Sequence, residues 1–198
     1  MTWSVICQEL DNLETFRGTP NIVQTAGIAV STNPYMTSDT KHRPLVVVGI
    51  VLESYSGGSL EMVPSEHCLF NYLWKRWATQ IWIALYRLQQ PGNTHSDIKP
   101  SDVALDADGN AVLIDISGIG GMTYDWRSSE ARDETLPNEL PNGVRLPNDA
   151  WAYGKLLSEL VRHLIESPSA NMLKRIADCL VIEKTHISMT LCEAILEL

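Results

Sequence analysis

Two short stretches decide how this chain folds: HSDIKPSD at residues 95–102 and LIDISG at residues 113–118. Each holds an aspartate, Asp97 in the first and Asp115 in the second, and Lys99 follows Asp97 by two residues. Carboxylates on neighbouring loops can converge on a divalent metal ion, and a nearby lysine can meet a phosphate. An isolated Asp-x-Lys is more often a pair of solvated turn residues, so the surrounding sequence has to decide between these two interpretations.

The segment between the two stretches predicts a small hairpin. Two short apolar runs, 103–105 and 111–114, flank the turn DADGN, which is rich in the residues that a tight reversal demands. Upstream, apolar residues at steps of three and four over 68–90 predict a long amphipathic helix. Downstream, residues 118–147 are polar and rich in Gly and Pro, and a loop of this length in a compact domain is usually functional.

The N-terminal part predicts a second hairpin, and both ends of the chain predict further helices. Residues 22–30 and 45–52 predict two antiparallel strands. The second strand is nearly continuous in Val, Ile and Leu, a pattern typical of burial on both faces. Apolar periodicity and helix-ending residues predict four more helices: 6–17, 149–165, 170–182 and 189–198.

The composition excludes several classes of protein. Of the 198 residues, 44% are hydrophobic and 20% are charged, which is ordinary for a globular protein and rules out wholesale disorder. With 15 basic and 24 acidic residues the formal net charge is −9, so the chain lacks the positive field that nucleic-acid binding needs. No apolar run spans a membrane, no signal peptide is visible, and the cysteines show no paired spacing. We therefore expect an intracellular, cytoplasmic protein with neither a nucleic-acid nor a membrane partner.

Together the motifs resemble those of eukaryotic protein kinases of the Ser/Thr type. The pattern His-x-Asp-x-Lys-Pro, the hairpin and the next aspartate are similar to the catalytic loop and the metal-binding DFG segment of that family. Further matches follow the family's order along the chain: TPNIV at 19–23 resembles the turn after the regulatory helix, ESYSGGSL at 53–60 resembles the hinge, LPNE at 136–139 resembles the APE motif, and DAWAYG at 149–154 resembles the start of the large C-lobe helix.

This resemblance implies an α+β, protein-kinase-like fold in a single domain over residues 1–198. Residues 1–53 would form a remnant of the N-lobe with one helix and two strands. Residues 54–59 would form the hinge, and residues 60–198 a mainly helical C-lobe.

The resemblance also assigns chemical roles to the two deciding stretches. Asp97 would accept the proton of the substrate hydroxyl, and Lys99 would neutralise the transferring phosphoryl group. Asp115 would hold the Mg²⁺ that bridges the nucleotide phosphates, and Asp102 would bind a second metal ion. His95 would have a structural role in packing and hydrogen bonding.

The resemblance also implies where adenine would bind. The base would hydrogen-bond to the backbone of Glu53 and Tyr55, beneath a gatekeeper at Leu52, with Ala104 on the floor of the pocket.

Three matches concern the framework of the domain. Glu9 matches the glutamate of the regulatory helix, and a solvated charge on the helix face explains it equally well. Glu139 matches the glutamate of the APE motif, and Asp149 matches the aspartate that opens the C-lobe helix pattern.

The chain departs from the family at several positions. The glycine-rich loop and the phosphate-anchoring lysine are absent, because only residues 1–7 precede the regulatory helix. Asp102 stands where the family has Asn, and Ser117 replaces the glycine of DFG. Ser96 replaces the arginine that usually clamps a phosphate on the activation loop, so we expect that phosphorylation of that loop is not an essential switch.

Three interpretations of function remain open at this point. The chain is a kinase that transfers the γ-phosphoryl group of ATP to protein Ser/Thr hydroxyls, a pseudokinase that binds a regulatory protein partner, or a fragment of a longer active kinase. Without the loop and the lysine, ATP and Mg²⁺ are expected to bind weakly. Uncovered strands of the N-lobe remnant predict self-association.

Overall fold

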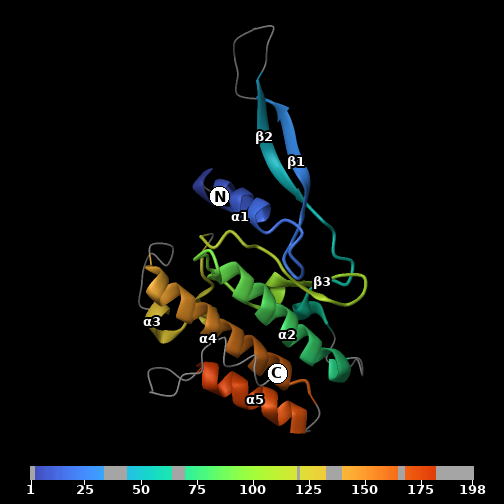
Figure 1. Ribbon diagram of the computed structural model, residues 1–198, viewed down its shortest axis with the longest axis vertical. Coiled ribbons are helices and arrows are strands. Elements are labelled where there is room, and N and C mark those ends of the chain that lie inside the picture. Colours follow the sequence, from blue (N-terminus) through green and yellow to red (C-terminus); the bar gives the residue numbers. More distant parts are fainter. Residues whose placement is uncertain are drawn as a thin grey trace.

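The structure is a computed structural model that describes residues 3–33, 44–63, 70–119, 121–132, 140–164 and 168–181. In these residues the chain forms five α-helices and two small antiparallel sheets. The elements are α1 (Trp3–Thr15), β1 (Thr25–Thr32), β2 (Leu45–Leu52), α2 (Phe70–Gln89), β3 (Val103–Leu105), β4 (Ala111–Leu113), α3 (Ser129–Arg132), α4 (Asn142–Val161) and α5 (Pro168–Val181). The expected α+β class is confirmed. Figure 1 shows the β1–β2 hairpin at one end of the molecule and the helices α2, α4 and α5 stacked at the other.

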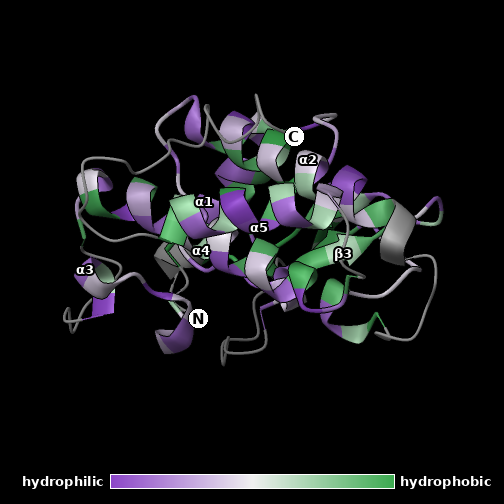
Figure 2. Ribbon diagram, turned by 90° about the horizontal axis from the view of Figure 1, so that it is seen from below, coloured by the Kyte–Doolittle hydropathy of each residue, from purple (hydrophilic) through white to green (hydrophobic). Residues whose placement is uncertain are grey.

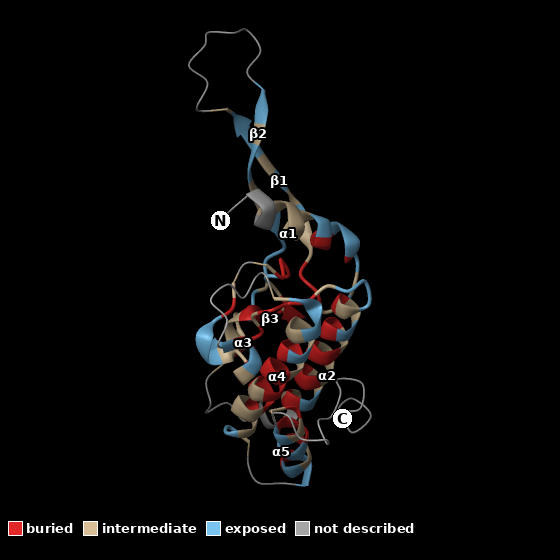
Figure 3. Cartoon of the chain, turned by 90° about the vertical axis from the view of Figure 1, so that its left-hand side faces the viewer, coloured by how far each residue is buried: buried red, intermediate tan, exposed pale blue. Residues whose placement is uncertain are grey.

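The β1–β2 hairpin is antiparallel, as predicted, but it stands away from the rest of the molecule (Figures 1 and 3). The prediction that residues 45–52 are buried on both faces is wrong, because most of β2 is exposed. An unbroken apolar run indicates a strand that can be buried, but the burial itself depends on neighbours. Ile50 is one hairpin side chain that packs against the core.

The segment before β1 belongs to the core and not to the hairpin. Residues 22–30 were expected to form one strand, yet β1 begins only at Thr25. Ile22 and Val23 are buried, and the backbone N–H of Val23 donates to the carbonyl of Leu113 at 2.9 Å. The N–H of Leu113 in turn donates to the Asn21 carbonyl at 2.8 Å. These bonds attach the N-terminal part of the chain to β4.

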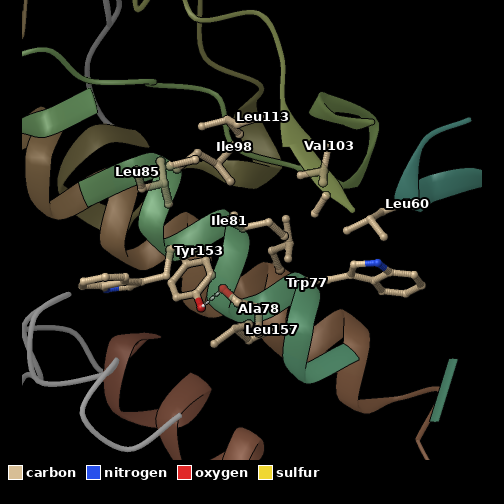
Figure 4. Close-up of a cluster of buried hydrophobic side chains, with 14 of the residues drawn as sticks. Leu60, Trp77, Ala78, Ile81, Leu85, Ile98, Val103, Leu113, Tyr153 and Leu157 are labelled. Atoms are coloured by element: carbon tan, nitrogen blue, oxygen red, sulfur yellow. Dashed lines mark hydrogen bonds between the residues drawn. The ribbon is translucent and has the colours of Figure 1, made fainter. Parts of the chain in front are cut away.

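Helix α2 forms the centre of the core, and its apolar stripe is the one that the sequence predicts. Figure 2 shows that the helices carry hydrophilic and hydrophobic residues on different faces. Ile81 and Leu85 of α2 are buried between β3–β4 and helix α4 (Figure 4). The Tyr153 hydroxyl of α4 donates to the Ala78 carbonyl of α2 at 2.9 Å, which satisfies a fully buried polar group.

Helix α4 begins earlier than the sequence indicates. It was expected to start at residue 149, but its first residue is Asn142, and Pro147 lies inside it. A proline removes one backbone hydrogen bond from a helix, so Gly143 and Pro147 look like helix-breaking residues when the sequence is considered alone. Packing of α4 against α2 and α5 outweighs that local cost.

Helix α5 matches its predicted range closely and packs against α4. The helix expected at 189–198 and the APE-like residue Glu139 lie outside the described residues. Within the described ranges, none of the helices combines the length and the apolar character needed to cross a lipid bilayer.

Two glycines of α4 give a matched test of this packing. A Cβ atom at Gly154 would lie 2.6 Å from the Leu180 Cβ and 3.2 Å from the Ala177 carbonyl, whereas a Cβ at Gly143 meets nothing within 4 Å. Gly143→Ala should therefore stabilise the fold by up to about 1 kcal/mol through helix propensity. Gly154→Ala should destabilise it by about 1–3 kcal/mol through overpacking. Urea unfolding measures both values, and stabilisation by both variants would contradict the α4–α5 contact.

Candidate active site

The buried carboxylate of Asp149 holds the loop that carries Asp97. Asp149 lies in α4 and is fully buried. Its Oδ2 accepts the backbone N–H of His95 at 2.9 Å, and its Oδ1 accepts that of Ser96 at 2.8 Å. Burial raises the pKa of Asp149, while these two bonds favour its charged form. Ser96 has a φ of 74°, a left-handed conformation that is costly for a non-glycine residue, and the two bonds to Asp149 offset that cost.

The imidazole of His95 connects the two loops of the site. His95 is buried, and its Nε2 donates to the Ile114 carbonyl at 2.8 Å. Its Nδ1 accepts the backbone N–H of Asp97 at 3.4 Å. One neutral tautomer makes both bonds, so His95 acts as a hydrogen-bonding spacer between the loop of Asp97 and the loop of Asp115.

Lys99 lies between two carboxylates of its own loop. Its Nζ forms an ion pair with Asp97 and another, at 2.6 Å, with Asp102. Burial alone would lower the pKa of Lys99, but the hydrogen bonds to Asp102 and Asp97 raise it above its usual value. Burial raises the pKa of Asp102, and Lys99 opposes that rise. Lys99 therefore stays charged beside Asp97.

Asp97 and Asp115 line one cavity of about 250 Å³, together with His95, Ser117 and Thr123. Asp115 follows β4 with a φ of 56° and is exposed. Of the two residues that the resemblance assigns to metal binding, Asp115 and Asp102, only Asp115 lines this cavity, and its carboxylate oxygens are of the kind that Mg²⁺ prefers. Asp102 does not line the cavity, and among the described residues no three His, Cys, Asp or Glu side chains gather as a metal-binding group.

The expected hinge runs along β3. The Gly57 N–H donates to the Leu105 carbonyl at 2.9 Å, and the Leu105 N–H donates to the Gly58 carbonyl at 2.8 Å. Ala104 of β3 is buried and forms an isolated bridge with Ser59. The segment Gly57–Ser59 therefore lies beside Ala104.

The predicted adenine contacts Glu53 and Tyr55 are held by Gln24. The Glu53 N–H donates to the Gln24 carbonyl at 2.9 Å, and the Tyr55 hydroxyl accepts the Gln24 N–H at 3.1 Å. Within the described part of the chain, the Tyr55 N–H and the Glu53 carbonyl make no backbone–backbone hydrogen bond. Leu52, the expected gatekeeper, is exposed at the end of β2.

Helix α1 contacts the Asp115 loop through an asparagine that the sequence analysis missed. Asn12 is buried, and its Nδ2 donates to the Ile116 carbonyl. Its Oδ1 accepts hydrogen bonds from Asn93 at 2.9 Å and from Gln8 at 3.1 Å. One feature of the sequence could have indicated this contact: Asn12 is a polar residue on the apolar stripe of the helix, four positions before Phe16.

Glu9 lies on the same helix, and the negative charge of Asp115 acts on its carboxyl group. Burial raises the pKa of Glu9, and the Asp115 carboxylate raises it further. Glu9 is thus a partly buried acid near the cavity and not a fully solvated charge on the helix face.

A threonine of the following loop contacts Asp97 directly, and no local sequence pattern indicated it. The Thr123 N–H donates to Asp97 Oδ1 at 2.6 Å, and its hydroxyl donates to Asp97 Oδ2 at 3.0 Å. The Thr123 hydroxyl is therefore hydrogen-bonded to Asp97, the residue to which the family resemblance assigns proton abstraction.

Arg145 occupies the region where the family's phosphate-binding arginine was expected. It donates from Nε to the Ser96 hydroxyl at 3.2 Å and from its guanidinium to the Gly118 carbonyl. The Ser96 hydroxyl itself donates to the Gly118 carbonyl at 3.1 Å. A Cβ at Gly118 would lie 2.3 Å from the Thr94 carbonyl, so only glycine fits there. Arg145 therefore ties α4, the Asp97 loop and the Asp115 loop together without a phosphate.

Comparisons with known proteins add nothing to this geometry: the chain matches no protein-family model and no curated protein. Its function has to be inferred from the site itself.

The position of Glu9 predicts a pH-dependent stability. A carboxyl whose folded-state pKa is raised favours the fold while it is protonated, and this contribution is lost as the pH rises through the folded pKa. Glu9→Gln should therefore stabilise the fold at pH 7 by up to about 0.5 kcal/mol, a small value because Glu9 is only half-buried. The gain should vanish near pH 4.

The matched control is Glu14→Gln, an exposed glutamate on the same helix that pairs with Arg17. It should give no gain at pH 7. Urea unfolding at the two pH values measures both variants, and equal behaviour of the two would contradict the approach of Glu9 to Asp115.

Proposed function

We propose that this chain is a protein-kinase-like domain that binds Mg²⁺-ATP weakly and directs phosphoryl transfer to a protein Ser/Thr hydroxyl. The observation that carries the proposal is that Asp97 and Asp115 line one cavity, with Lys99 ion-paired to Asp97. The Thr123 hydroxyl donates to Asp97 Oδ2 at 3.0 Å, which shows that an alcohol can reach this carboxylate, and a carboxylate so placed can accept the alcohol's proton. Residues 1–53, 54–59 and 60–198 then correspond to an N-lobe remnant, a hinge and a C-lobe.

Mg²⁺-ATP would supply the transferable phosphoryl group and a metal charge that offsets the phosphates. Different residues of the chain would have different roles in the transfer of this phosphoryl group. Asp97 accepts the proton of the hydroxyl, and Lys99 holds a positive charge beside it. Asp115 offers carboxylate oxygens from the opposite loop, and the hinge at Glu53 and Tyr55 offers backbone groups to the base.

A second cavity gives a protein substrate room next to this site. It measures about 460 Å³ and lies between the 3₁₀ turn Leu60–Met62, the Lys99 loop and α4. Apolar side chains such as Trp126 line it together with the acidic Glu61 and Glu159. A bound chain whose hydroxyl meets Asp97 would place a neighbouring side chain here.

A second candidate function is a pseudokinase that binds a regulatory protein. Thr123 already occupies both oxygens of Asp97, and Lys99 is shared with Asp102. These contacts lower the expected rate of transfer, because a substrate hydroxyl has to displace Thr123 before Asp97 can accept its proton.

Nucleotide binding and phosphotransfer separate the two functions. We expect a small thermal shift at millimolar Mg²⁺-ATP and none without Mg²⁺, because stabilisation follows the ratio of ligand to Kd. Asp115→Asn should abolish the shift. Asp97→Asn should keep the shift and abolish transfer of the γ-phosphoryl group to a protein acceptor.

Asp108→Asn, an exposed aspartate in the β3–β4 turn, is the matched control and should change neither readout. No shift at several millimolar Mg²⁺-ATP would contradict the enzyme and leave the binding module. Transfer that survives Asp97→Asn would contradict the role given to Asp97.

A further inference from the structure

A short 3₁₀ turn, Tyr124–Trp126, connects the walls of the two cavities, which measure about 250 Å³ and 460 Å³. Thr123, directly before the turn, lines the smaller cavity, and Trp126, its last residue, lines the larger one. Thr123 also donates to Asp97 from its N–H at 2.6 Å and from its hydroxyl at 3.0 Å. The position of this turn therefore sets part of each wall and the surroundings of the Asp97 carboxylate.

The turn has few backbone hydrogen bonds of its own. The Trp126 N–H donates to the Thr123 carbonyl at 2.9 Å, and the Arg127 N–H donates to the Tyr124 carbonyl at 3.3 Å, which is longer than usual. A single helical turn is not stable by itself in water, because one or two hydrogen bonds do not offset the cost of ordering its backbone. Contacts with another element have to hold it.

Lys155 of helix α4 supplies such contacts. Its Nζ donates to the Asp125 carbonyl in the middle of the turn and lies 4.6 Å from the centre of the Trp126 ring. It also lies 5.9 Å from the ring centre of Trp151, a residue of α4. An ammonium group within about 6 Å of an indole ring is attracted to the face of that ring. One side chain therefore holds both the backbone and the last side chain of the turn against α4.

The positive charge of Lys155 is directed to these rings and not to a carboxylate. Within the described residues Lys155 forms no ion pair, and Glu159, one helical turn further along α4, pairs with Arg162 at 2.7 Å instead. Lys155 is partly buried and Trp151 is buried. A cation–π contact becomes stronger as water is excluded from it, so burial strengthens this one.

Two arginines add weaker contacts of the same kind. Arg132 of α3, which lies beside α4 (Figure 1), is 5.7 Å from the ring centre of Trp151 and 5.9 Å from that of Tyr124. Arg127 lies 5.8 Å from the same Tyr124 ring. Tyr124 is 62% exposed, so its two contacts are more hydrated than those of Lys155 and hold the turn less firmly.

A separate anchor holds the chain just after the turn. The Ser128 N–H donates to Oδ1 of Asn148, a fully buried residue of α4, at 2.8 Å. This bond does not involve Lys155, so it should persist when Lys155 is changed. The role of Lys155 can therefore be separated from the general packing of this loop on α4.

We propose that Lys155 is a positioning residue. By holding the 3₁₀ turn against α4, it places Thr123 on the Asp97 carboxylate and Trp126 in the wall of the larger cavity. It acts on Asp97 only through the turn and Thr123. The inference concerns the position of the turn, and it holds whether or not Asp97 acts in phosphoryl transfer.

Hydrogen–deuterium exchange of the whole chain, resolved at single amides by NMR, tests the proposal. Lys155→Met keeps an unbranched side chain of similar length but removes the charge and the donor. We expect exchange at the amides of Thr123 and Trp126 to rise at least about fivefold, while the amides of Ser128 and of α2 stay within about twofold. Lys155→Arg keeps a cation and N–H donors, so it should restore protection to within about twofold of the native chain.

Lys174→Met is the matched control, because Lys174 is an exposed lysine of the neighbouring helix α5, and it should leave exchange at Thr123 and Trp126 unchanged. Unchanged exchange at these two amides in Lys155→Met overturns the proposal. So does a rise that extends to α2, since that is a general loss of stability. An equal effect of Lys174→Met, or a failure of Lys155→Arg to restore protection, overturns it as well.

Discussion

A single buried carboxylate organises the candidate site. Asp149 accepts the backbone N–H groups of His95 and Ser96, and it is fully buried inside the helical part of the molecule. With those two amides fixed, Ser96 adopts its left-handed conformation and the His95 ring reaches the Ile114 carbonyl. Asp97, the next residue, is thereby held facing the cavity. Without this carboxylate the loop would lose the two bonds that offset its backbone strain.

Two further residues, one in helix α1 and one in helix α4, hold the loops of Asp97 and Asp115 in place. Asn12 binds the Asp115 loop from helix α1, and Arg145 binds both loops from helix α4. Because Arg145 contacts Ser96 and Gly118 directly, the connection between the loops needs no phosphate group. The described contacts between the two loops are therefore made by side chains of the fold itself. The hairpin contributes little to this core beyond the contact of Ile50.

Much of the local structure could be predicted from the sequence, because periodicity and turn residues report local preferences. The long helix α2, strand β2 and the β3–β4 hairpin lie close to their predicted ranges. The start of α4 was missed because Gly143 and Pro147 resemble a loop, and tertiary packing overrides such signals. The exposure of β2 was missed because burial depends on neighbours. The contacts of Asn12, Thr123 and Arg145 join distant parts of the chain, and no local pattern reports them.

Hydrogen–deuterium exchange of Asp149→Asn tests most directly whether this carboxylate organises the site. An asparagine keeps the shape of the side chain but loses the charge and one acceptor. We expect exchange at the amides of His95 and Ser96 to rise at least about tenfold, and exchange in the 113–118 loop to rise with it, while the amides of α2 stay protected. Unchanged protection of His95 and Ser96 in a folded variant would contradict the account.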